Sequence, residues 1–116
     1  MQVKKMKMID YDLALEMLDG EKELLDELLQ AYIDEENLDE KKLCDLESKD
    51  LLEAAKYVHF YKGGARQLAA KDLAQKGQNL EDVLRGKSQG NLHDLNMEFI
   101  DSYTKTIEEI KSILNS

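Results

Sequence analysis

Proline and tryptophan are absent from this sequence of 116 residues, cysteine occurs only once, and histidine occurs only twice. Because proline is the strongest helix breaker, its absence favours long, uninterrupted helices. The lone Cys44 has no partner for an internal disulfide, and a free thiol is ordinary in a reducing compartment. His59 and His93, without a pair of cysteines, cannot assemble a structural zinc site, and we expect no metal in this chain.

Long apolar runs and an excess of positive charge are absent as well. No stretch approaches the roughly 20 apolar residues of a membrane-spanning helix. The first ten residues include three lysines and no apolar run that suits a signal peptide. The formal charge of −9 opposes binding to nucleic acid or to an anionic membrane surface. We therefore expect a cytoplasmic protein whose partners include neither nucleic acid nor a membrane.

The residues that are present predict helices throughout. No segment alternates with the period of two that is typical of a strand. Apolar residues instead recur three and four positions apart in six segments, at about 11–20, 21–33, 38–47, 51–68, 71–85 and 91–114. Asp10, Asp50 and Asn91 stand where N-caps are needed. At 34–37 the apolar phase slips, which indicates either a kink or the start of a separate helix.

The expected fold class is therefore all-α. The helix lengths and short connections predict an antiparallel four-helix bundle with one or two short additional N-terminal helices. The length suits a single domain over 1–116, of which we expect residues 1–9 to be flexible. The absence of linkers favours a stand-alone protein.

The segment 51–68 carries the most unusual residues of the chain. On a helical wheel its core stripe contains six residues, Leu51, Ala54, Val58, Tyr61, Ala65 and Leu68. His59 projects about 130° away from that stripe, toward solvent or a partner. On the side of His59 the wheel places Lys56, Lys62, Gly63 and Arg66.

A lone histidine on a helix surface is most often only a polar residue. Gly63 and Gly64, however, each cost roughly 1 kcal/mol in the middle of a helix. Gly63 lies one turn beyond His59, and its missing side chain is expected to leave the imidazole uncrowded. Neighbouring cations favour a neutral, nucleophilic imidazole and stabilise an anionic group near the ring. The pattern therefore favours a functional histidine.

Residues 59–70, "HFYKGGARQLAA", resemble the H-x-L-K-G-x-A-x-x-x-G/A-A signature of histidine-containing phosphotransfer (Hpt) domains. Five signature positions are occupied as expected, namely His59, Lys62, Gly63, Ala65 and Ala70. Tyr61 replaces the usual leucine, and Ala69 stands where the family usually has glycine. The segments 9–33 and 80–87 also resemble Hpt domains, so that the likeness covers essentially the whole chain.

The resemblance implies a phosphocarrier, which is not an enzyme in the usual sense. The Nε2 atom of His59 would accept a phosphoryl group from a receiver-domain aspartate or a kinase and pass it to another receiver. The implied partners are response-regulator receivers and a sensor or hybrid histidine kinase. The chain itself is expected to be a monomer. The receiver would supply the magnesium ion, so that no cofactor belongs to this chain. Lys62 would hold phosphoryl oxygens.

The resemblance also assigns a role on the next helix. In chemotaxis-type phosphotransfer domains a glutamate there accepts the Nδ1 proton of the histidine, and other members often have a glutamine. Glu81 aligns with this position, with Gln78 and Arg85 three residues before and four after. The alternative is a solvated Glu81 in an ordinary pair with Arg85. Gln78 is a further candidate for contact with the partner or the phosphoryl group.

Other candidates for such contacts are Lys56, Phe60, Gly64, Arg66 and Arg85. Solvation alone would explain both arginines. Leu52 and Phe60 fall outside the core stripe. Each is expected either to contact a docked partner or to pack against a neighbouring helix. The competing hypothesis for the whole chain is a non-catalytic helical adaptor or a degenerate Hpt-like interaction domain, in which His59 is incidental.

Overall fold

The computed structural model describes residues 7–35 and 38–115. Within these residues all regular structure is helical, in six helices: α1 (Tyr11–Met17), α2 (Lys22–Glu35), α3 (Glu40–Lys49), α4 (Leu51–Gln67), α5 (Lys71–Leu84) and α6 (Leu92–Leu114). The prediction of an all-α fold is confirmed. After the phase slip the chain forms a separate helix, α3, and residues 36–37 lie outside the described part.

Short polar side chains begin four of the helices. Asp10 accepts a hydrogen bond from the Leu13 N–H, and Asp39 accepts one from Lys41. Asp50 ends α3 and caps α4 by accepting from the N–H groups of its second and third residues. Asn91 caps α6. These bonds satisfy backbone donors that have no partner inside the helix, which fixes where each helix starts.

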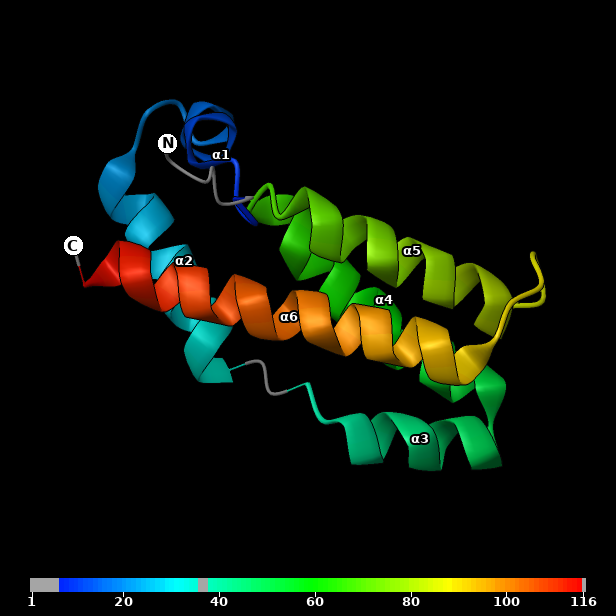
Figure 1. Ribbon diagram of the computed structural model, residues 1–116. Helices are drawn as coiled ribbons and strands as arrows, with labels where there is room; N and C mark the ends of the chain where they lie inside the picture. Colours follow the sequence, from blue (N-terminus) through cyan, green and yellow to red (C-terminus); the bar gives the residue numbers. More distant parts are fainter. Residues whose placement is uncertain (1–6, 36–37, 116) are drawn as a thin grey trace, which may run out of the picture.

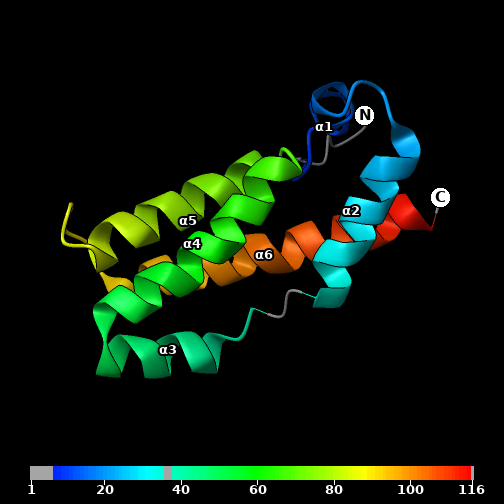
Figure 2. The same cartoon turned by 180° about the vertical axis from the view of Figure 1, so that it is seen from behind.

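Helices α4, α5 and α6 form the centre of the bundle (Figures 1 and 2). The contact between α4 and α5 is the most extensive of any helix pair, followed by that between α5 and α6. Helix α2 packs against α6, and α3 packs against α4, so that the break between α2 and α3 divides one side of the bundle. A hydrogen bond of 2.7 Å from the Asn96 amide to Glu47 also ties α3 to α6.

The core lies where these helices meet, and its largest fully buried side chains include Leu25, Leu29, Leu43, Leu73, Leu80, Phe99 and Ile110. On α4 the predicted stripe is buried except for Leu51, which is 46% exposed because it is the first residue of the helix. Ala55 and Lys62 are buried although the wheel placed them off the stripe. Helix α4 is covered by both α3 and α5, so that its buried face is wider than one stripe.

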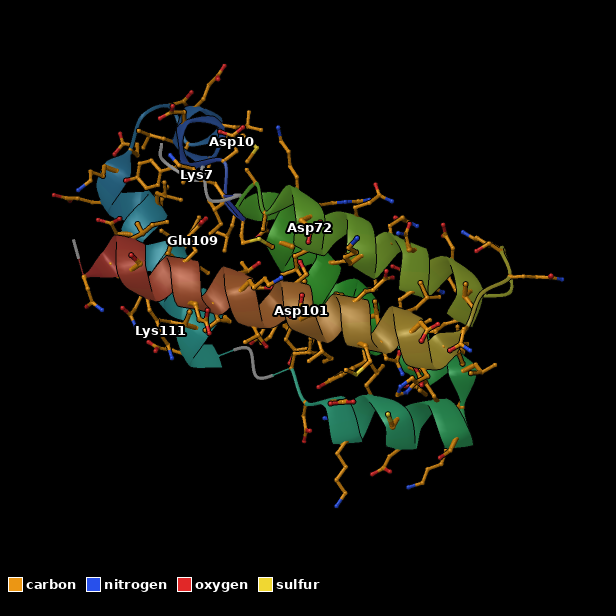
Figure 3. All side chains as sticks on the ribbon, in the orientation of Figure 1. Lys7, Asp10, Asp72, Asp101, Glu109 and Lys111 are labelled. Atoms are coloured by element: carbon orange, nitrogen blue, oxygen red, sulfur yellow. The ribbon has the colours of Figure 1, made fainter. Side chains whose placement is uncertain are left out.

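The segment before α1 is fixed to the far end of α6. The Glu109 carboxylate accepts hydrogen bonds from the N–H groups of Met8 and Ile9, at 3.1 and 2.6 Å. Figure 3 shows Glu109 at the end of the bundle where Lys7 and Asp10 also lie. Both Met8 and Ile9 are buried. These contacts hold the backbone of two of the nine residues, whereas the expected flexibility of 1–9 stays a prediction, and residues 1–6 lie outside the described part.

The turn between α4 and α5 contains a residue in the left-handed region. Ala69 has φ = 55°, and its carbonyl accepts a hydrogen bond of 3.1 Å from the Asp10 N–H. For an L-residue with a Cβ this conformation costs roughly 1–2 kcal/mol, whereas glycine adopts it freely. Ala69 is also the position where the sequence signature usually has glycine, and the backbone geometry gives the physical reason.

Replacing Ala69 by glycine should therefore raise the free energy of unfolding by up to about 1 kcal/mol, because relief of the left-handed strain outweighs the lost methyl burial. Urea unfolding measures the change. The matched control is Ala55→Gly, which makes the same chemical change in the interior of α4 and should cost about 1–2 kcal/mol. Equal losses in both variants would contradict the assignment of strain to Ala69.

Candidate functional site

The side chain of His59 lies on the outer face of α4 and is 60% exposed. Its Nδ1 atom lies 3.2 and 3.1 Å from the two carboxylate oxygens, Oε1 and Oε2, of Glu81 on α5. Because a carboxylate has only acceptors, this contact places the ring proton on Nδ1. In the neutral form of the ring, Nε2 then carries the lone pair.

Glu81 is a buried carboxylate, with a side chain only 6% exposed. Its Oε1 accepts from the Lys62 ammonium at 2.7 Å, and its Oε2 accepts from the Arg85 Nε at 2.7 Å. Burial raises the pKa of this carboxyl, but hydrogen bonds from Lys62 and Arg85, the charge of Lys62 and the His59 contact outweigh burial and lower the pKa to about 2. Glu81 is therefore ionised at any physiological pH.

The helical wheel predicted that Lys62 lies in solvent beside His59, but its side chain is buried. Its side chain is 5% exposed, and its ammonium also donates a hydrogen bond of 3.0 Å to the Gln78 side-chain oxygen. A lysine can lay its methylene stem along an apolar surface, and this one runs into the interface between α4 and α5. The expected group of exposed cations around His59 is wrong in this respect, because Lys62 neutralises Glu81.

A second layer of polar contacts extends from Lys62. The Gln78 side-chain oxygen also accepts from Arg66 at 3.1 Å, and its amide nitrogen donates to Asp82 at 2.7 Å. Gln78 thus provides the Lys62 ammonium with a second acceptor besides Glu81. Lys56 stays outside this network, in an exposed ion pair of 3.3 Å with Glu53. Sequence reasoning missed Asp82, although its spacing of four residues from Gln78 was a usable signal.

The glycines near the site have different surroundings. A Cβ built on Gly63 would have no atom within 4 Å, and the same Cβ on Gly77 would lie 3.1 Å from the Cβ of Lys62 and from a ring carbon of Phe99. A methyl group at Gly63 would therefore not crowd the imidazole, contrary to the expectation. Gly64 is half-buried. Sequence reasoning missed Gly77, whose signal was a glycine in the middle of a helix.

A surface depression of about 590 Å³ lies beside His59 and is lined by Leu52, His59, Glu81, Leu84, Arg85 and Lys87. The depression extends from His59 toward the N-terminus of α4 and reaches Leu52, which precedes His59 by two turns. Helical side chains lean in this direction. Lys87 comes from the loop after α5 and was missed by sequence reasoning. Leu52 and Phe60 are 50% and 60% exposed, so that about half of each side chain is open to a partner.

A family model for the Hpt domain matches residues 12–114. The chain belongs to the Hpt domain family. Hpt domains are phosphocarriers of two-component signalling, and the family interacts with receiver domains and histidine kinases. The comparisons with curated proteins and with solved structures found no match.

Two further properties of this Hpt domain concern ions and membranes. Within residues 7–35 and 38–115 no group of three or more histidine, cysteine, aspartate or glutamate side chains could hold a metal ion. No helix in the same part of the chain is long and apolar enough to cross a membrane. The negative charge of the buried Glu81 is paired with the cations of Lys62 and Arg85.

The low pKa of Glu81 predicts a specific acid response of the Hpt domain. In the folded chain the pKa is about 2, against an ordinary value of 4.5. Glu81 therefore contributes stability above pH 4.5, and this contribution disappears as the pH falls from there through about 2. A shift of this size corresponds to at most about 3 kcal/mol.

Urea unfolding at a series of pH values, for the wild type and for Glu81→Gln, measures this contribution. The wild type should lose up to about 3 kcal/mol more stability than the variant over that pH range, because only the wild type titrates at this position. The other carboxylates titrate in both proteins and cancel in the comparison. Parallel pH profiles would contradict the assignment of an ionised, stabilising Glu81.

Proposed function

We propose that this Hpt domain is a phosphorelay intermediate, in which the Nε2 atom of His59 accepts a phosphoryl group and passes it on. The donor is a receiver-domain aspartate or a kinase, and the acceptor is another receiver. The single observation that carries the proposal is the contact of Nδ1 with the ionised Glu81. This contact gives the exposed imidazole the tautomer that nucleophilic attack through Nε2 requires.

The transfer step balances within the proposed pair of proteins. The lone pair of Nε2 attacks the phosphorus of the aspartyl phosphate, and the bond from phosphorus to the aspartate oxygen breaks. The aspartate leaves as a carboxylate with the electron pair. Nδ1 keeps its proton, so that the phosphorylated ring is a cation, which the negative charge of Glu81 stabilises. Transfer to the next receiver reverses these steps.

The surroundings of His59 suit the approach of a receiver. Phe60 and Leu52 offer exposed apolar surface on the same helix as the histidine, and the missing side chain of Gly63 leaves open space there. Arg85 and Lys87 line the depression beside the imidazole and can neutralise phosphoryl oxygens. Lys62 would reach those oxygens only by leaving the Glu81 carboxylate.

The proposal leaves most of the catalysis to the partner. In-line phosphoryl transfer needs a metal ion close to the transferred group, and the receiver brings that ion with its aspartate. We therefore propose no cofactor for the Hpt domain itself. Its own contribution is an oriented nucleophile, a balancing negative charge from Glu81 and a surface for docking.

Replacing His59 by glutamine tests the proposal directly. The variant should fold normally because the side chain is exposed, and it should accept no label from phosphorylated receivers. The wild type should form an acid-labile, alkali-stable adduct, located at His59 by mass spectrometry. The matched control is His93→Gln, which removes the other, exposed histidine and should be labelled like the wild type.

Label that persists in His59→Gln would contradict the phosphocarrier assignment. An unlabelled wild type that still binds its partner, with unchanged binding in His59→Gln, would favour the helical adaptor.

Gly63→Ala should raise the free energy of unfolding by up to about 1 kcal/mol, because the residue is helical and the new methyl group has no atom of another helix within 4 Å. The same change should slow transfer from a phosphorylated receiver by narrowing the docking surface. Urea unfolding and a quenched-flow transfer assay measure the two effects. Ser112→Ala on the exposed side of α6 is the control. It should raise the free energy of unfolding somewhat and leave the transfer rate unchanged. Full activity in the stabilised Gly63→Ala variant would exclude an access role for Gly63.

A further inference from the structure

Gly77 lies in the middle of α5 and is buried against α4. A Cβ built there would lie 3.1 Å from the Cβ of Lys62, 3.3 Å from its Cγ and 3.1 Å from the Cε1 atom of Phe99. Contacts this short are tighter than ordinary van der Waals packing. Glycine in a helix interior costs about 1 kcal/mol relative to alanine. The glycine at this position therefore lowers the stability of α5 but allows α4 and α5 to approach closely.

The residue that uses the space is Lys62. Lysine is almost never fully buried without a partner, yet the side chain of Lys62 is only 5% exposed. Its stem passes over Gly77, and its ammonium reaches the Glu81 carboxylate at 2.7 Å. Gly77 and Glu81 are four residues apart on one face of α5, so that a single lysine spans both.

A chain of direct contacts therefore leads from Gly77 to the imidazole. The stem of Lys62 lies where a Cβ on Gly77 would press on it, the Lys62 ammonium binds one oxygen of Glu81, and both oxygens of Glu81 lie within 3.2 Å of the His59 Nδ1. Moving the stem outward would pull the ammonium away from the carboxylate. Glu81 would then be left with fewer donors to balance its burial and would hold the ring less firmly.

We propose that Gly77 is a positioning residue for phosphotransfer, which sets the depth of Lys62 and through it the charge and orientation of Glu81 against His59. Gly77 touches neither the imidazole nor a phosphoryl group, so that its effect runs only through these two side chains. The role in phosphotransfer rests on the proposed function, whereas the effect on the imidazole does not.

The competing explanation is packing against Phe99 alone, because the Cβ would press on that ring equally closely. A double-mutant cycle separates the two explanations. It compares Gly77→Ala in the wild-type background and in a Lys62→Ala background, which keeps the Cβ of residue 62 but removes the ammonium through which Gly77 is proposed to act on Glu81. A packing role through Phe99 gives the same effect in both backgrounds, and a positioning role gives an effect only when Lys62 is present.

The first readout is the ¹⁵N spectrum of the His59 ring, which reports the tautomer. Gly77→Ala should shift the Nδ1 and Nε2 resonances toward a mixture of tautomers, and Gly77→Ala added to Lys62→Ala should cause no further shift. The second readout is the rate at which His59 is phosphorylated by phosphoramidate, a small donor that needs no receiver. Gly77→Ala should lower this rate by about tenfold, a fraction of what a positioned acid–base partner contributes.

If Gly77→Ala alone does not fold, the cycle is repeated in a Phe99→Leu background, which relieves the contact with the ring. Unchanged ring resonances in a folded Gly77→Ala variant, or equal shifts with and without Lys62, would overturn the proposal. Failure of receivers to label the wild type would instead refute the proposed function, and the ring resonances would still decide the role of Gly77.

Discussion

The arrangement of the site depends on one buried negative charge. The Glu81 carboxylate is almost completely removed from water, and it is tolerated there because Lys62, Arg85 and His59 all donate to it. The buried carboxylate requires hydrogen-bond donors, and this requirement determines the positions of the three donor side chains. The histidine tautomer, the unusual burial of a lysine and the position of Arg85 follow from this single requirement.

The helix pair α4 and α5 provides the setting for that charge. Gly77 lets the two helices approach closely, and a ring carbon of Phe99 on α6 lies equally close to the same point. The surrounding helices hold this pair in place, with α3 on α4 and α6 on α5. The bundle thus isolates Glu81 from water while His59, one layer further out, remains exposed.

Much of this architecture could be predicted from the sequence, because it depends on local patterns. The helices follow from apolar spacing, and Asp10, Asp50 and Asn91 cap them as short polar side chains do. The exposure of His59 follows from the angle between residues on a helix. A wheel gives that angle but not how far a neighbouring helix wraps around, which is why Lys62 was expected in solvent. It also does not show where a helix begins, which is why Leu51 was expected in the core.

The features that escaped prediction join distant parts of the chain. Glu109 binds the backbone of Ile9 across 100 residues, and no local pattern marks that contact. Gly77 is explained only by the two side chains opposite it, and Lys87 reaches the site from a loop. The contact of Glu81 with His59 was expected from resemblance to a family.

The sharing of Glu81 among three donors has a consequence for the energetics of the carrier. A phosphorylated imidazole with a proton on Nδ1 is a cation, and a lone carboxylate beside it would make that state very stable. Lys62 and Arg85 draw on the same two oxygens and weaken this effect. Every 1.4 kcal/mol by which they do so changes the phosphorylation equilibrium about tenfold. In the proposed carrier, the cations around Glu81 would therefore adjust the group-transfer potential of the phosphohistidine, and with it the ease with which the phosphoryl group moves in either direction.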